Sequence, residues 1–160
     1  MTKFCIDSSV FLGMNSTDEI TRISCKNFFI ENVHAEILIS FEQIGNCDNI
    51  IWSFAFELQS LYYPFMDLFH TEIPVKRLPF TENTFSYLSK NHSIDFSQRL
   101  NVAFAQERDT IIYSNHLELI DQFENVFRIP ISLNEHKFSN QLEKCYQKSL
   151  NLRINTNLLK

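Results

Sequence analysis

Short continuous runs of apolar residues recur along the chain, separated by longer stretches in which apolar residues repeat at helical spacing. The runs lie within residues 3–6, 37–39 and 110–113, and a fourth strand is predicted near residues 127–129. A strand that is buried on both faces is apolar at every position, because neither of its faces meets solvent. These segments are therefore predicted to be the strands of a parallel sheet that helices cover on both sides.

Helices are predicted in the stretches between the strands. Ser16 and Glu19 have the spacing of a capping box, in which two side chains bind free amides of the first helical turn. Pro64 is expected to end one helix and open the next, because proline disrupts a helix interior. Pro74 and Pro79 indicate a loop. The predicted helices cover residues 16–33, 48–63, 64–72, 81–89 and 95–107, with another helix within 135–150.

The alternation of strands and helices favours a three-layer α/β/α fold around a short, mainly parallel central sheet. A chain of 160 residues suits one domain with one sizeable core. We expect the α/β domain to span residues 1–133 and residues 134–160 to form a helical tail that packs on it. The sequence shows no linker, internal repeat or low-complexity segment.

Composition excludes several classes of site. The chain has 16 Phe and only 2 Gly, which argues against a glycine-rich phosphate-binding loop. Its 4 Cys and 5 His are scattered without the spacing of a zinc site or a redox motif. No apolar run approaches the roughly 20 residues that span a bilayer, and the first residues lack the pattern of a secretory signal. The expected protein is cytoplasmic, without a membrane segment.

The net charge of −5 bears on the class of partner. A protein that binds duplex DNA through its phosphates usually presents a basic face. A local basic patch is compatible with the negative total charge, so this class of partner stays open. An acidic total agrees better with an enzyme that gathers carboxylates around a cation.

Polar residues follow three of the predicted strands at the points where the strands end. Ligands of parallel sheets collect beyond the carboxyl ends of the strands. Asp7 has two interpretations: it caps a turn, or it belongs to a cluster assembled from distant strand ends. The residues at the three ends are Asp7 and Ser8 after the first, Ser40 and Glu42 after the second, and Ser114, Asn115 and His116 after the third.

Three short motifs in this order resemble those of PIN-domain ribonucleases. "CIDSSVFLG" is similar to that family's opening strand, which ends in an aspartate followed by a small hydroxyl residue. "QRLNVAFA" at 98–105 resembles the small-residue stripe of a core helix, and "TIIYSNH" at 110–116 occupies the place of the strand and turn that follow. The resemblance covers roughly residues 3–130. It implies an α/β/α fold of PIN type.

The resemblance also implies a metal-dependent hydrolysis of RNA. Asp7 matches the family's first acid, whereas Gln98, His116 and Asn46 stand where the family places others. Glu42 and Asp95 lie near enough to serve instead. The implied site therefore holds Mg²⁺ or Mn²⁺ on Asp7, Glu42 and Asp95, which are also the catalytic residues, with Ser8, Ser114, Asn115 and His116 orienting water or the carboxylates.

The departures from the family pattern leave a second interpretation open. The chain is then a catalytically degenerate PIN-like module that binds RNA or a protein partner. PIN-like ribonucleases are often toxins paired with an antitoxin, so the resemblance implies an antitoxin or another protein partner. Aromatic residues in segment 52–69 belong to the core or form an exposed surface for a homodimer.

Overall fold

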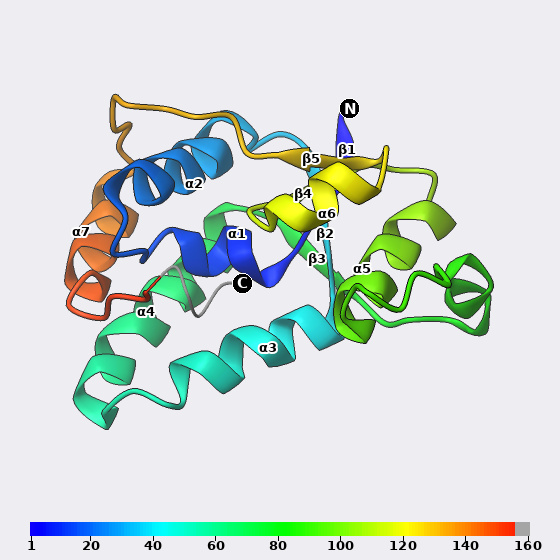
Figure 1. Cartoon of the computed structure of the whole chain (residues 1–160). Helices are drawn as coiled ribbons and strands as arrows, with labels where there is room; N and C mark the ends of the chain where they lie inside the picture. Colours follow the sequence, from blue (N-terminus) through cyan, green and yellow to red (C-terminus); the bar gives the residue numbers. More distant parts are fainter. Residues whose placement is uncertain (156–160) are drawn as a thin grey trace.

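A computed structural model of the protein describes residues 1–155 and places five parallel strands in one sheet, in the order β3–β2–β1–β4–β5 (Figure 1). Each neighbouring pair is parallel, so all five strands end at the same edge. The predicted fold class, an α/β fold around a short parallel sheet, is confirmed. The strands are β1 (Lys3–Ile6), β2 (Glu36–Ser40), β3 (Val75–Leu78), β4 (Ile112–Ser114) and β5 (Val126–Arg128).

Helices cover both faces of the sheet. On β1, Phe4 and Ile6 face one apolar core, and Cys5 between them faces the other. Helices α1, α2, α3, α4 and α7 build the first core, and α5 and α6 build the second. The helices are α1 (Ser8–Gly13), α2 (Glu19–Glu31), α3 (Phe41–Ile51), α4 (Phe56–Glu72), the 3₁₀ helix η1 (Glu82–Tyr87), α5 (Phe96–Glu107), α6 (Leu117–Gln122) and α7 (Asn140–Ser149).

The loop predicted between Pro74 and Pro79 is wrong, because β3 runs between these two prolines. Lys76 and Arg77 are exposed in this strand, and only its ends are half-buried. An edge strand pairs on one side only and tolerates flanking prolines, so it lacks the continuous apolar pattern of the central strands.

Several helix boundaries also differ from the prediction. The predicted helix 48–63 is divided between α3, which already begins at Phe41, and α4, with a break at residues 52–55. Pro64 lies inside α4, which continues through it. Phe65 and Phe69 of this helix are fully buried, and their packing outweighs the local cost of the proline. Helix α2 is capped by Asp18, whose carboxylate accepts the amide of Thr21 at 2.8 Å, and not by the predicted Ser16.

A buried ionic network joins the segment after residue 134 to α2. Lys26 is fully buried, yet its Nζ lies 2.8 Å from Glu135 and 3.0 Å from Glu143. The same Nζ is 4.6 Å from the ring centre of Tyr146. Arg22 contacts Glu135 at 2.8 Å and donates to the Tyr146 hydroxyl at 2.9 Å. Helix α7 packs against α4 beside this network (Figure 1), so residues 135–149 belong to the folded body.

We predict that Lys26→Met destabilises the protein by about 3 kcal/mol, because it leaves carboxylates without their buried partner. Lys76→Met is the matched control: Lys76 is exposed and lies 3.4 Å from Glu36, so its loss is expected to cost less than about 1 kcal/mol. Urea unfolding of both variants measures the difference. An equal loss in the free energy of unfolding in the two variants would show that the buried network stabilises the fold no more than a surface ion pair does.

The same network predicts acid sensitivity. Hydrogen bonds from Arg22, followed by those from Lys26, lower the pKa of Glu135 to about 2 against the opposing effect of burial. A carboxylate with a lowered pKa stabilises the fold above its ordinary pKa of about 4.3, and this contribution is lost as the pH falls toward the folded-state value.

Glu135→Gln is therefore expected to lower stability at neutral pH and to flatten its decline below about pH 4.3. Urea midpoints over a pH series measure both effects. Glu57→Gln, a change at an exposed site on α4, serves as the control. Its urea midpoint is expected to change with pH as that of the wild type does. If the stability of Glu135→Gln depends on pH as the wild type's does, other carboxylates cause the loss of stability in acid.

Candidate functional site

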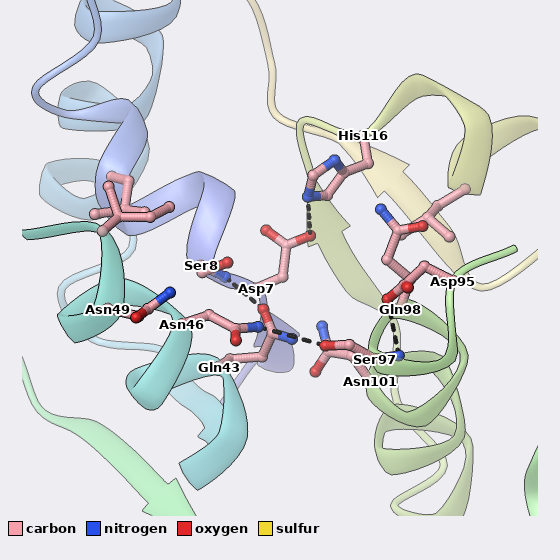
Figure 2. Close-up of a pocket in the computed structure, with 13 residues that line it drawn as sticks. Asp7, Ser8, Gln43, Asn46, Asn49, Asp95, Ser97, Gln98, Asn101 and His116 are labelled. Carbon is pink, nitrogen blue, oxygen red and sulfur yellow. Dashed lines mark hydrogen bonds and ion pairs between the residues drawn. The ribbon is translucent and has the colours of Figure 1, made fainter. Parts of the chain in front are cut away.

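A cavity of about 260 Å³ lies at the carboxyl edge of the sheet. The start of α1 forms its floor, α3 and α5 form opposite walls, and the start of α6 closes it (Figure 2). Ligands of parallel sheets usually bind at this edge. The lining residues are Asp7, Ser8, Leu12, Gln43, Asn46, Asn49, Ile50, Asp95, Ser97, Gln98, Asn101, His116 and Leu119.

Asp7 is almost fully buried at the end of β1, where it caps α1. Its Oδ1 accepts the Ser9 amide at 3.0 Å and the Ser9 hydroxyl at 2.5 Å. Its Oδ2 accepts the Ser114 hydroxyl at 2.5 Å. Asp7 is therefore a helix cap that also lines the cavity. Three hydrogen bonds to one carboxylate offset the cost of burying its charge.

The other strand-end residues surround Asp7 in different ways. The Ser8 amide donates to Gln43 Oε1 at 2.9 Å, and Ser8 lines the cavity. His116 also lines it, with Nε2 at 3.9 Å from Asp7 Oδ2. The Ser114 hydroxyl donates to Asp7 and also accepts the His116 amide at 3.0 Å. Ser114 therefore positions both the carboxylate and the imidazole.

Asn115 lies outside the cavity lining and ties β4 to α1. Its backbone amide donates to the Ser9 hydroxyl at 2.9 Å, and its side-chain amide donates to the Ser9 carbonyl at 3.0 Å. Its Nδ2 also lies 3.3 Å from Cys25 Sγ. Gly13 makes this approach possible, because a Cβ there would stand 2.4 Å from that sulfur.

The predicted carboxylate trio is only partly assembled. Asp95 lines the cavity with Asp7, although it is exposed and its Oδ2 caps α5 by accepting the Ser97 amide at 3.0 Å. Glu42 is not among the lining residues. Successive residues of a helix point about 100° apart, and Gln43 rather than Glu42 takes the direction that meets Ser8. Within residues 1–155, no group of three or more His, Cys, Asp or Glu side chains is placed to hold a metal ion. The donors present do not fit the implied three-carboxylate metal site.

Amide side chains dominate the cavity walls instead. Gln43, Asn46 and Asn49 lie at three-residue intervals on α3, and Gln98 and Asn101 repeat this spacing on the facing α5. Residues three apart on a helix share a face. Asn46 reaches across to α5, where its Nδ2 lies 3.4 Å from Ser97 Oγ (Figure 2). The i, i+3 amide spacing is a sequence signal that could have identified Gln43, Asn49 and Asn101 in advance.

Two of these amides carry a buried carbonyl oxygen without a hydrogen-bond partner among the described residues, Gln98 Oε1 and Asn101 Oδ1. An unsatisfied buried acceptor costs roughly 1–3 kcal/mol, and native structures contain few of them. Four other buried side-chain atoms among the described residues also lack a partner, and none of them belongs to a residue that lines this cavity. On this wall the two oxygens are acceptors that water or a ligand can complete.

The electrostatic character of the cavity is weakly acidic. Asp7 and Asp95 are its carboxylates, and none of the described residues that line it is a lysine or arginine. Most of its polar groups are neutral amides and hydroxyls, which both donate and accept hydrogen bonds. The cavity is therefore suited to a neutral polar ligand, or to one that brings a cation with it.

Comparisons with known proteins agree with this fold. A model of a family described as a family of unknown function (DUF6190) matches residues 1–159. No curated protein matches the chain. Among solved structures, a chain from the crystal structure of VapBC2 of Rickettsia felis, bound to a DNA fragment from their promoter, is similar with a TM-score of 0.62. The similarity covers 79% of this chain and 97% of that one at 10% sequence identity.

At this level of identity the likeness to VapBC2 concerns the fold alone, and it agrees with the PIN-like α/β architecture implied by the sequence resemblance. None of the helices within residues 1–155 has the length and apolar character needed to cross a membrane.

We predict that Asp7→Asn lowers the free energy of unfolding by about 1–3 kcal/mol, because one acceptor oxygen becomes a donor facing serine hydroxyls. Asp95→Asn is the matched control. It is exposed, and asparagine caps a helix about as well as aspartate, so a change below about 0.5 kcal/mol is expected.

Urea unfolding in buffer with a chelator measures both variants without a contribution from divalent ions. A gain of stability in Asp7→Asn would instead show that the folded state holds this carboxylate under repulsion.

Proposed function

The chain belongs to the DUF6190 family of unknown function, and we propose that it is a PIN-like module that binds single-stranded RNA in the amide-lined cavity without a resident metal. This is the degenerate form of the nuclease that the sequence resemblance implies.

One observation carries the proposal. The three positions at which the resemblance expects further acids, Asn46, Gln98 and His116, all line the cavity together with Asp7. Their shared position supports a site in the place that the resemblance implies, in which Asn46, Gln98 and His116 stand instead of carboxylates. Such a change removes the charge repulsion that an acidic cluster exerts on phosphates when no cation is bound.

Amide and hydroxyl groups are common ligands of nucleic acids. Asn, Gln and Ser side chains donate to phosphate and sugar oxygens and also read base edges. Single-stranded RNA exposes all of these groups, because its bases are not paired in a double helix. The lining of this cavity therefore provides the contacts that RNA binding needs without requiring catalysis.

A second candidate function is an Mg²⁺- or Mn²⁺-dependent ribonuclease, as the sequence resemblance implies. The observation that favours it is the shared position of Asp7 and Asp95 on one cavity. Magnesium is usually held by one or two carboxylates and completes its shell with water and substrate phosphates. These two residues would then be the metal ligands, and Glu42 would lie outside the cavity.

A protein partner is a further part of the proposal. The similar VapBC2 structure is that of a complex, which supports an antitoxin or another protein as a partner of this chain. Trp52 and Phe56 are exposed at the turn between α3 and α4, so they offer an apolar surface to such a partner or to a second copy.

We predict that the purified protein binds single-stranded RNA equally well with Mg²⁺ and with a chelator, and that it leaves the RNA intact. Gln98→Glu adds a carboxylate to the cavity. In chelator it should weaken RNA binding by about tenfold, the equivalent of 1.4 kcal/mol, and it should strengthen Mn²⁺ binding. Fluorescence anisotropy and calorimetric titration measure these effects.

Gln106→Glu makes the same chemical change on the same helix, outside the cavity lining, and is expected to bind RNA and Mn²⁺ as the wild type does. Cleavage that requires Mg²⁺ or Mn²⁺ and disappears in Asp7→Asn would replace the binding function with the ribonuclease. Absence of both RNA binding and cleavage would refute both candidates.

A further inference from the structure

We infer that a second cavity, of about 200 Å³, binds a small organic ammonium ion, with the apolar body of the ligand against aromatic side chains and its charge against Asp48 and Asp67. The inference goes beyond the proposed RNA binding and does not depend on it. α3 presents different residues to the two cavities, Asn46 to the amide-lined cavity and Cys47 to the second. Successive helical residues point about 100° apart, so the second cavity is a separate site on another face of α3.

Apolar and aromatic side chains make up much of the lining of the second cavity. Phe11 and Tyr62 are almost fully buried, and Met66 is half-buried. The Phe11 ring lies 5.6 Å from the ring of His70, and the Tyr62 ring lies 5.6 Å from that of Tyr63, all four residues being part of the lining. An apolar cavity of roughly 150 Å³ holds a benzene molecule, so this one has room for a single ring with a short substituent.

The charged groups of the lining favour a cation. Asp48 is half-buried and accepts the Tyr63 hydroxyl at 3.1 Å, and Asp67 is exposed. Arg77 is the one lysine or arginine among the described residues of this lining, so the two carboxylates outnumber it. The rings of Tyr62 and Tyr63 add to the preference, because aromatic faces attract ammonium groups.

His70 does not oppose a positive ligand. Burial, followed by the positive charge of Arg77, lowers the pKa of His70 to about 4, so its imidazole is uncharged at neutral pH. Its Nδ1 is buried and has no hydrogen-bond partner within residues 1–155. Native structures contain few such atoms, and this one is a polar group that water or a ligand can complete.

Other ligands and the other cavity fit less well. A carboxylate ligand would gain Arg77 but meet two charges of its own sign, and a neutral ring would leave the attraction of those charges unused. The amide-lined cavity also holds two carboxylates, but most of its lining is amide and hydroxyl groups, which lose water without replacement when an apolar body covers them. An ammonium ion with an apolar body matches both parts of the second cavity.

The test is calorimetric titration of the full-length protein with three probes of similar shape: phenethylamine, phenethyl alcohol and hydrocinnamate. Phenethylamine is expected to bind about tenfold more tightly than the neutral alcohol, and the anionic hydrocinnamate most weakly.

The double variant Asp48→Asn/Asp67→Asn is expected to weaken phenethylamine binding about tenfold and to leave phenethyl alcohol binding unchanged. The unchanged alcohol shows that the cavity itself is intact. Glu57→Gln/Asp121→Asn is the matched control, because it removes the same charge from exposed sites outside this lining. It is expected to bind all three probes as the wild type does.

Amide chemical shifts measured by NMR locate the bound amine. Shift changes are expected in residues 62–70 of α4, and changes confined to α5 would place the amine in the amide-lined cavity and overturn the inference. Equal affinity for the amine and the alcohol, tighter binding of hydrocinnamate, or an equal effect of the two double variants would overturn recognition of the charge. No binding heat with millimolar phenethylamine would overturn the site itself. None of these results bears on RNA binding, which the anisotropy measurements test separately.

Discussion

The hydrogen bond from Ser114 to Asp7 joins the ends of the two central strands, and the arrangement of the cavity depends on it. β1 and β4 are adjacent and parallel, so their carboxyl ends meet at one point. Asp7 fixes the start of α1 there through Ser9, and Asn115 binds the same serine from β4. One carboxylate thus organises two strand ends and a helix, which explains why it is buried whether or not it meets a ligand.

The rest of the site follows from this centre. α3 and α5 form the opposite walls of the cavity, so the residues on their facing sides decide its chemistry. Acids on both walls would repel one another and need a cation. Amides at Gln43, Asn46, Gln98 and Asn101 avoid this repulsion and are complementary to a neutral polar group.

The central strands could be predicted from the sequence because burial on both faces makes them uniformly apolar, and the parallel order then located the site edge at Asp7. The edge strand β3 was missed because Lys76 and Arg77 face solvent in it. Of the two acids predicted beside Asp7, Asp95 lines the cavity and Glu42 does not, since a shift of one residue along a helix turns a side chain by about 100°. The amide rows were overlooked because a single Asn or Gln indicates no chemistry. Only their i, i+3 spacing on two facing helices indicates that they line one cavity.

The stability of the fold and the chemistry of the cavity reside in different parts of the molecule. Lys26, Glu135 and Glu143 hold the C-terminal segment on α2, and none of them lines the cavity. The Phe65 and Phe69 cluster of α4 is likewise absent from its lining. Substitutions at Asn46, Gln98 or Asn101 therefore change the lining of the cavity without removing the contacts of these two clusters. An α/β scaffold supported in this way can change the charge of its cavity lining and remain folded.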